Sequence, residues 1–314
     1  MLEYLVILLD ETSASFCHYT NPCSKRKSIS QDILHKGIRF AMKQNLMIQF
    51  VYPDYPLPKE IEKEIETIDN SKIKPASVAD EKTSVVIVDN WEFVEVMNLH
   101  KSTTLRVLKD DFFFNYLEIV PLLKEVPNLN VVIMDIDRFS EQDFKTYREI
   151  LLHLSEIIES LYLEGFSPQT NLLTDRMILK KMNNCNAGEK SITLAPNGKF
   201  YTCPAFYYDN IDESIGDVES GLNIKNQKLY KIECAPICRR CDAFQCKRCI
   251  WLNRTNTFEV NTPSHEQCVV AHLERNASRK LLQNIRKHGI FLPEQEEIKE
   301  IDYLDPFEKR ELWQ

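Results

Sequence analysis

Cysteine is the residue type whose number and spacing in this sequence most directly suggest chemistry. The chain has 10 cysteines among its 314 residues, and five of them fall between Cys234 and Cys249. Thiolates are soft ligands that select zinc ions or iron–sulfur clusters. Eight thiolates are enough for two sites of four thiolates each. Eight of the cysteines lie between residues 185 and 268, namely Cys185, Cys203, Cys234, Cys238, Cys241, Cys246, Cys249 and Cys268.

A zinc site and inert buried cysteines are the two alternatives to iron–sulfur clusters. In a zinc site, Cys238 and Cys241 would pair with Cys246 and Cys249 as two knuckles. Only four residues separate these two pairs, whereas a common zinc ribbon leaves about fifteen to twenty. Such a site would also leave the remaining four cysteines without a role. The cysteines could instead be inert buried side chains, but their crowding favours iron–sulfur clusters.

The composition narrows the class of protein. A net charge of −8 argues against a general nucleic-acid-binding or membrane-binding surface, because both favour basic patches. The N-terminal stretch MLEYLVILLDE is too short to span a membrane and is wrongly flanked for a signal peptide. We therefore expect a buried first strand and a cytoplasmic protein, in which clustered thiols usually bind metal or do redox work.

The scarcity of glycine excludes two common nucleotide-binding folds. The chain has seven glycines, and only Gly37 and Gly165 precede residue 180. A glycine-rich loop that cradles phosphate groups therefore cannot exist in this region. Rossmann and P-loop proteins both need such a loop, so both are excluded.

Apolar runs alternate with helical patterns up to about residue 180. Continuous valine and isoleucine runs between helices are typical of a parallel sheet covered on both faces. Helices are clearest in residues 30–44 and 140–165, the second with Ser140 as N-cap and Gly165 as its stop. Five or six βα units predict an α/β fold with an incomplete (βα) barrel. The predicted strands are Leu5–Glu11, Leu46–Tyr52, Ser84–Asp89, Thr103–Leu108 and Leu129–Ile136.

The pattern changes from about Met182 onward to short strands, turns and cysteines. The turn Pro196–Gly198 between two short apolar runs predicts a β-hairpin. A helix is predicted from Val269 to a stop at Gly289, and an acidic tail follows it. We therefore expect a barrel over residues 1–180, a small cysteine-rich domain over residues 181–270, and a C-terminal helix with an acidic tail over residues 271–314.

The cysteine spacing resembles the SPASM domain, which follows the catalytic barrel in many radical S-adenosylmethionine (radical-SAM) peptide maturases. Cys185 is followed by Gly198-x4-Cys203, then by Cys238-x2-Cys241 and three more cysteines. The two spacings after Cys241 are each one residue shorter than in that domain. The resemblance implies that Cys238, Cys241, Cys246 and Cys268 hold one [4Fe–4S] cluster, and that Cys185, Cys203 and Cys249 hold a second, with Cys234 as its fourth ligand.

The front half lacks two parts of the radical-SAM machinery. A radical-SAM barrel carries Cys-x3-Cys-x2-Cys after its first strand, and its three thiolates leave one iron free to chelate the cofactor. The corresponding loop here offers Cys17 and Cys23, with five residues between them. The Gly-Gly-Glu that follows the second strand of such enzymes is missing from Phe50–Pro58. We therefore expect no cleavage of S-adenosylmethionine by this chain.

The stretches DETSASFCHY, IQFVYPDYPLP and LTDRMILKKMNNCNAG resemble the CXXX-repeat peptide maturase family, and the resemblance spans most of residues 4–275. That family is associated with radical-SAM enzymes that modify small cysteine-repeat peptides. We therefore expect an accessory protein with two [4Fe–4S] clusters that works with a cysteine-repeat precursor peptide and a radical-SAM maturase, and with neither nucleic acid nor a membrane. A peptide-modifying redox enzyme and a zinc-stabilised binding module remain the alternatives.

Other residues are weaker candidates for chemistry. Cys17 and His18 could act as nucleophile and base, but adjacent residues rarely point together on a strand. Asp135 and Asp137 are expected on one face at the C-terminal end of a strand, either as a metal-binding or peptide-binding pair or as capping groups. His265 is either a hydrogen-bond donor near a cluster or a surface histidine. A peptide-sized groove at the strand ends would be bordered by Cys17–Lys27, Tyr52–Tyr55 and Asp135–Asp137.

Overall fold

A computed structural model describes residues 2–13, 19, 25–89, 91 and 101–306 of the chain. The chain forms two compact units, each built from two segments. The first unit combines Met1–Arg106 with Asn186–Cys234, and the second combines Val107–Cys185 with Ala235–Gln314. The predicted boundaries at residues 180 and 270 divide the chain by sequence pattern and differ from these units. That division stays a prediction.

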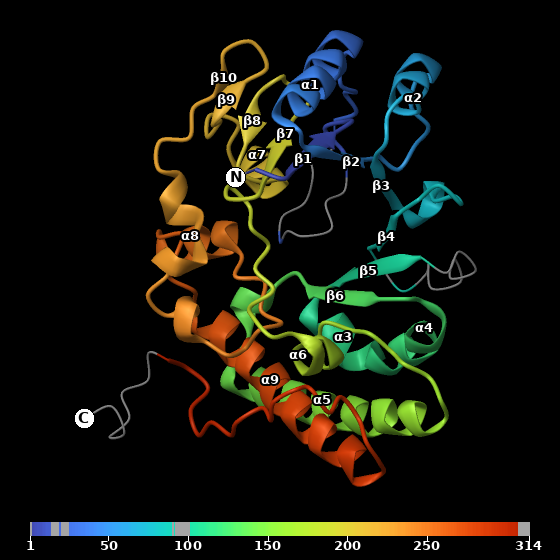
Figure 1. The fold of residues 1–314 in the computed structure, drawn as a ribbon, viewed down its shortest axis with the longest axis vertical. Coiled ribbons are helices and arrows are strands. Elements are labelled where there is room, and N and C mark those ends of the chain that lie inside the picture. The colour runs from blue at the N-terminus through green and yellow to red at the C-terminus, as the bar shows by residue number, and fades with distance from the viewer. Residues whose placement is uncertain (1, 14–18, 20–24, 90, 92–100, 307–314) are drawn as a thin grey trace. The chain divides into compact units, whose positions relative to one another are not determined.

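The first unit contains a mostly parallel sheet whose first five strands lie side by side in chain order. Its strands are β1 (Tyr4–Leu8), β2 (Met47–Val51), β3 (Ser71–Pro75), β4 (Val85–Val88), β5 (Ser102–Val107), β7 (Ser191–Leu194) and β8 (Phe200–Tyr201). Strands β1 to β5 pair in parallel, each with the next, and β7 pairs in parallel with the free side of β1. The order is β5-β4-β3-β2-β1-β7-β8, with β8 antiparallel to β7 (Figure 1).

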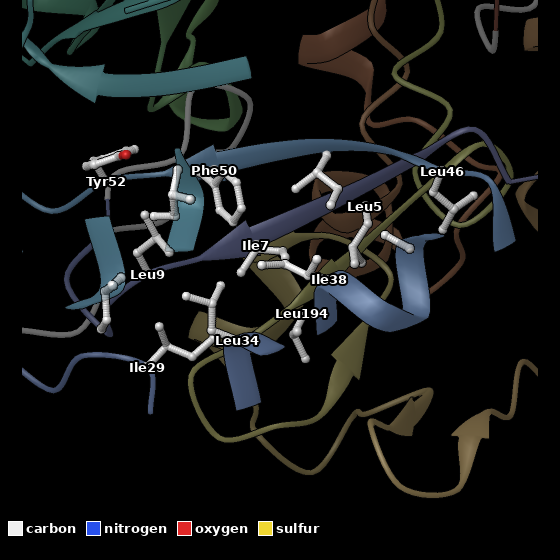
Figure 2. Packing of buried hydrophobic residues seen from close by; sticks show 14 of the residues in the cluster. Leu5, Ile7, Leu9, Ile29, Leu34, Ile38, Leu46, Phe50, Tyr52 and Leu194 are labelled. Atoms are coloured by element: carbon white, nitrogen blue, oxygen red, sulfur yellow. The ribbon is translucent and has the colours of Figure 1, made fainter. Parts of the chain in front are cut away.

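Helices α1 (Gln31–Gln44) and α2 (Lys59–Ile65) follow β1 and β2 and cover one face of this sheet. Figure 2 shows Ile7 of β1 and Phe50 of β2 packed with Leu34 and Ile38 of α1. A Cβ atom at Gly37 would lie 2.3 Å from the Cδ2 atom of Leu194, so glycine lets α1 approach the sheet closely. The continuous apolar runs of the strands therefore build the core of the first unit together with the apolar faces of α1 and α2.

The second segment of the first unit begins with the predicted hairpin. Strands β7 and β8 pair as expected, and Gly198 has a φ of +79°, a left-handed conformation that favours glycine. The hairpin prediction is confirmed. The remaining elements of this unit are η1 (Ala76–Val78), α7 (Pro204–Asp209), β9 (Gly216–Asp217), β10 (Gly221–Leu222), η5 (Gln227–Tyr230) and η6 (Ile232–Cys234).

Two long helices, α5 (Glu141–Leu163) and α9 (His265–Lys287), pack against each other in the second unit (Figure 1). The predicted start of α5 is confirmed: Ser140 and Asp143 form a reciprocal capping box. The other elements are α3 (Lys109–Asn115), η3 (Tyr116–Glu118), α4 (Ile119–Glu125), β6 (Leu129–Ile133), η4 (Ile136–Arg138), α6 (Thr174–Ile178), η7 (Cys238–Arg240) and α8 (Ile250–Thr257).

The five predicted strands are confirmed, but β3 is an additional strand that the sequence pattern does not predict. Its sequence, SKIKP, contains two lysines, which usually mark an exposed segment. Both are buried in the structure. Lys74 forms an ion pair with Asp80 at 2.8 Å and lies over the ring of Tyr52 at 4.6 Å. The pattern of β3 fails to predict a strand because these partners lie outside it.

The predicted start of the C-terminal helix at Val269 is wrong. Helix α9 begins at His265, because the Ser264 hydroxyl accepts a hydrogen bond from the Gln267 amide at 3.3 Å and caps the helix. Cys268 therefore lies in the first turn of α9. Among the described residues, no helix combines the length and apolar character that a membrane span requires.

Candidate iron–sulfur site

Four of the predicted ligands come together within the second unit. Cys238 begins η7, and Cys241 and Cys246 follow it in the loop before α8. Cys268 comes from α9. The thiols interact electrostatically: Cys246 with Cys238 and Cys241, and Cys268 with the other three. The sulfur atoms of this group, which we call the four-thiol group, are therefore neighbours although Cys268 is distant from the others in the chain.

Burial dominates the acid–base behaviour of the four-thiol group. Burial raises the pKa of Cys238 to about 11 and that of Cys246 to about 12, and it also raises the pKa values of Cys241 and Cys268. The charged form of a buried thiol is disfavoured unless a cation is close. The group therefore gains most from a bound metal centre, which keeps its ligands deprotonated.

Backbone amides donate hydrogen bonds to two sulfur atoms of the four-thiol group and to the sulfur of Cys249. The amide of Ala243 donates to Cys241 at 3.4 Å, and that of Arg248 donates to Cys246 at 3.5 Å. Such N–H donors stabilise negative charge on sulfur and help to set the potential of iron–sulfur clusters. The amide of Leu252 donates to Cys249 at 3.5 Å, where the cysteine caps α8.

Two arginines fix the shape of the loop that carries these cysteines. The guanidinium of Arg275 is fully buried and donates to both carboxylate oxygens of Asp242. Arg176 donates to the backbone carbonyl of Asp242 at 2.6 Å and stacks over Phe244. Asp242 follows Cys241 directly, so this double attachment holds the Cys241 sulfur in place.

A third buried arginine, Arg248, lies between Cys246 and Cys249. Its side chain donates to Asn184 at 3.2 Å and to Asn261 at 2.7 Å. Its positive charge lowers the pKa of Cys238 against the larger effect of burial. Arg248 therefore ties the cysteine loop to the segment that carries Cys185 and also favours thiolate at Cys238.

The predicted second set of ligands is brought together only in part. The amide of Cys185 donates to the Lys247 carbonyl at 3.1 Å, which places Cys185 beside the loop that ends at Cys249. Cys203, which is buried, and Cys234, which is exposed, belong to the first unit. The assignment of Cys185, Cys203, Cys234 and Cys249 to one cluster stays a prediction.

The donors of the four-thiol group fit a [4Fe–4S] cluster. Such a cluster takes four thiolates and is stabilised by amide hydrogen bonds to sulfur, and both are available here. Within the described residues, no group of three or more histidine, cysteine, aspartate or glutamate side chains is arranged to hold a metal ion, so the fit of the four-thiol group is one of donor type and number. The fourth member of the group is Cys268 of α9, whereas the zinc alternative requires Cys249.

Comparisons with known proteins concern the fold. No protein-family model matches the chain, and no curated protein matches it in sequence. Native anSMEcpe with bound AdoMet and Cp18Cys peptide is 12% identical, with a TM-score of 0.63 over 91% of this chain and 100% of that one. Histidine-tagged anSMEcpe with bound AdoMet is 13% identical, with a TM-score of 0.62 over 93% and 97%. The chain therefore shares the (βα) barrel fold of these structures. The prediction of a (βα) barrel is confirmed at this level.

The structure places the predicted aspartate pair, Asp135 and Asp137, outside a strand. Asp135 and Asp137 do not project from a strand, because β6 ends at Ile133 and both residues lie in or beside η4. The Asp135 carboxylate accepts the Lys109 amide at 2.8 Å, so it caps the start of α3. Of the two interpretations of this pair, capping therefore fits Asp135.

The structure also contradicts one of the predicted borders of the peptide-sized groove. Tyr52 is buried in the core of the first unit and donates to Glu62 at 3.2 Å, so it cannot border a groove. The hydroxyl of Tyr55 donates to the buried carboxylate of Asp10. Cys17, His18 and Cys23 lie outside the described residues. The base of their loop is closed by a bridge between Asp10 and Ser28.

The sequence did not reveal the residues that surround the four-thiol group. Asp242 and Arg248 lie between cysteines, and their charge within a cysteine-rich loop is a signal that the sequence does contain. Arg176, His272 and Arg275 lie on helices far along the chain. His272 is buried, and its Nε2 atom lies 3.4 Å from the Cys241 sulfur. The helical pattern around these three gives no signal that they approach thiols.

Proposed function

We propose that this protein is an accessory maturation protein for a ribosomally synthesised cysteine-repeat peptide. It holds two [4Fe–4S] clusters and acts with a partner radical-SAM maturase by binding the peptide or by transferring electrons. The observation that carries the proposal is the four-thiol group, in which Cys238 is buried and the other three thiols are half-buried, in a chain that shares the barrel fold of anSMEcpe. Bound clusters supply one-electron transfer.

The residues around the thiols are suited to holding such clusters. Cys238, Cys241, Cys246 and Cys268 bind the first cluster. Asp242 and Arg275 hold its loop rigid, and Arg248 offsets the negative charge that accumulates on the thiolates. The second cluster is assigned to Cys185, Cys203, Cys234 and Cys249 by the SPASM-like spacing. In this assignment the cysteine-rich domain covers residues 181–270, after a degenerate barrel of about six units over residues 1–180.

A peptide partner is supported by the anSMEcpe structure, which carries a peptide as well as AdoMet. The cysteine-repeat peptide itself is supported by the resemblance to the CXXX-repeat maturase family. The chain lacks the three-cysteine motif and the Gly-Gly-Glu sequence, so the partner maturase, rather than this chain, cleaves S-adenosylmethionine.

The metal content tests the proposal. Protein purified anaerobically and reconstituted with iron and sulfide should be brown and carry about eight irons and eight sulfides per chain. Cys238→Ser and Cys185→Ser should each reduce the iron content to about half, and Cys17→Ala should leave it unchanged. A colourless protein that binds stoichiometric zinc after the same treatment would contradict the proposal and favour the zinc-stabilised module.

A second experiment tests the division of labour. The reduced, reconstituted protein is incubated with S-adenosylmethionine, and 5′-deoxyadenosine is measured. We expect none, together with measurable binding of a cysteine-repeat peptide by calorimetry. Sustained production that Cys17→Ala abolishes would show that the chain is a radical enzyme in its own right.

A further inference from the structure

The tail after α9 returns along that helix toward the four-thiol group. Glu300 forms an ion pair with Arg279 at 3.1 Å. The carbonyl of Leu304 accepts a hydrogen bond from the Nδ1 atom of His272. Asp305 then binds the Nδ1 atom of His265. The tail thus runs antiparallel to α9 and reaches the helix turn that carries Cys268.

The end of this tail contacts the surroundings of the thiols directly. The ring of Tyr303 packs edge-on against His272 at 5.9 Å, and the Nε2 atom of His272 lies 3.4 Å from the Cys241 sulfur. Asp305 is 5% exposed. Tyr303 interacts electrostatically with Cys241, and Asp305 interacts with Cys268. Residues 303–305 therefore lie against His272, which contacts Cys241, and against His265, in the helix turn that carries Cys268.

We propose that residues 302–305 form a strap that closes the four-thiol group, and that His272 is the positioning residue that joins the strap to Cys241. A carbonyl oxygen only accepts hydrogen bonds, so Nδ1 of His272 donates to Leu304, and this fixes the ring with Nε2 toward the sulfur. The strap shields the thiols from solvent and from reagents, and it shields the cluster once that is bound. Its role at the cluster rests on the proposed function, whereas its closure over the thiols does not.

Truncation gives a matched pair of chains. One chain ends at Ile301 and lacks the strap, and the control ends at Pro306 and keeps it. In metal-free protein, alkylation by iodoacetamide is followed at each cysteine by mass spectrometry. Cys234, which is exposed, serves as the internal standard. We expect Cys241 and Cys268 to react about tenfold faster in the chain without the strap, as the loss of a locally closed state predicts, with Cys234 unchanged.

Point variants guard against misfolding of the truncated chain. Asp305→Asn weakens the contact with His265, and Glu297→Gln removes the same charge at an exposed position of the tail. Asp305→Asn should raise the reactivity of Cys268, and Glu297→Gln should not. Equal alkylation rates in the chains ending at Ile301 and Pro306, together with no effect of Asp305→Asn, would overturn the inference.

The reconstituted protein extends the test to the cluster. The rate at which a chelator bleaches the iron absorbance should be about tenfold higher without the strap. If neither chain takes up iron, the proposed function fails while the alkylation result still decides on the strap. If both chains take up iron and bleach at the same rate, the strap does not shield the cluster.

Discussion

In the first unit the buried side chains around β1 and α1 are aliphatic and aromatic, whereas around the thiols of the second unit they include three arginines. Leu5, Ile7 and Phe50 are completely buried against α1 and α2. Arg176, Arg248 and Arg275 are buried at 5%, 1% and 0% exposure. Apolar burial stabilises without directional partners, but a buried guanidinium is stable only where its partners are in place.

The difference in buried side chains indicates which interactions stabilise each region. The first unit should tolerate conservative changes that preserve the volume of its core side chains. The cysteine region depends on individual contacts, such as that between Asp242 and Arg275, and in the proposed holoprotein on metal as well. Unfolding of the second unit, which holds all four thiols of the four-thiol group, should therefore depend on iron more strongly than unfolding of the first, which contributes only Cys203 and Cys234 to the proposed second cluster.

The largest expected effect is in the apolar core. Phe50→Ala should lower the free energy of unfolding of the first unit by about 3 to 5 kcal/mol, because it removes a fully buried ring and leaves a cavity. The loss should be the same with and without iron. Urea unfolding of both forms measures it, with Met47→Ala, at an exposed position of the same strand, as the control. A loss that depends on iron would break the contrast between the two units.

A somewhat smaller loss is expected in the cysteine region. Asp242→Ala leaves the buried guanidinium of Arg275 without its carboxylate partner, at a cost of about 1 to 3 kcal/mol, because Asp242 itself is partly exposed. Because the loop beside Cys241 is then loosened, the variant should also retain less iron. Thermal unfolding and iron analysis test both effects. Asp137→Ala, at an exposed position of the same unit, should change neither, and equal behaviour of the two variants would refute the bracing role of Asp242.

Glu274 makes the second unit sensitive to pH. Its carboxylate accepts hydrogen bonds from Tyr147 at 2.8 Å and Gln245 at 3.3 Å. Burial nevertheless raises its pKa from 4.5 to about 7. The folded state thus holds this proton to higher pH than the unfolded chain does. Protonation of Glu274 therefore contributes its full amount to the stability of the folded state below pH 4.5. This contribution is lost as the pH rises to about 7.

Glu274→Gln should remove this loss, because glutamine fits the same partners without a charge. The melting temperature of the variant relative to the wild type should rise between pH 4.5 and 7, by the equivalent of at most about 3 kcal/mol. Glu296→Gln, at an exposed position of the tail, provides the comparison. Parallel pH profiles for the wild type and Glu274→Gln would show that Glu274 does not titrate in this range.

The smallest effect is expected at a helix end. Ser140→Ala removes the capping box of α5 and should cost about 1 kcal/mol. Ser160→Ala, at an exposed position inside the same helix, should be neutral or slightly stabilising, because alanine is the better helix former. Thermal unfolding of the two variants distinguishes them. A larger effect at Ser160 would mean that packing, rather than capping, determines the start of α5.

Local patterns in the sequence were sufficient for most of the secondary structure. The apolar run of β1, the Ser140 cap and the turn at Gly198 each act through near neighbours, so the residue types alone predict them. The sequence pattern did not predict strand β3, because the buried Lys74 is stabilised by partners outside the strand, namely Asp80 and the ring of Tyr52. The predicted start of α9 was wrong because the helical pattern was followed only from Val269, although Ser264 caps the helix before Cys268.

By itself, the sequence determined that thiols are crowded between residues 185 and 268 and that an α/β barrel precedes them. Both follow from composition and from spacing along the chain. The grouping of Cys268 with Cys238, Cys241 and Cys246 was implied by the resemblance to the SPASM domain. Only the tertiary structure decided that Arg275 and Arg176 brace the loop and that the tail lies against His272. These contacts join segments that are distant in the chain, and their energies depend on burial and on the direction of individual hydrogen bonds, which spacing in a sequence does not encode.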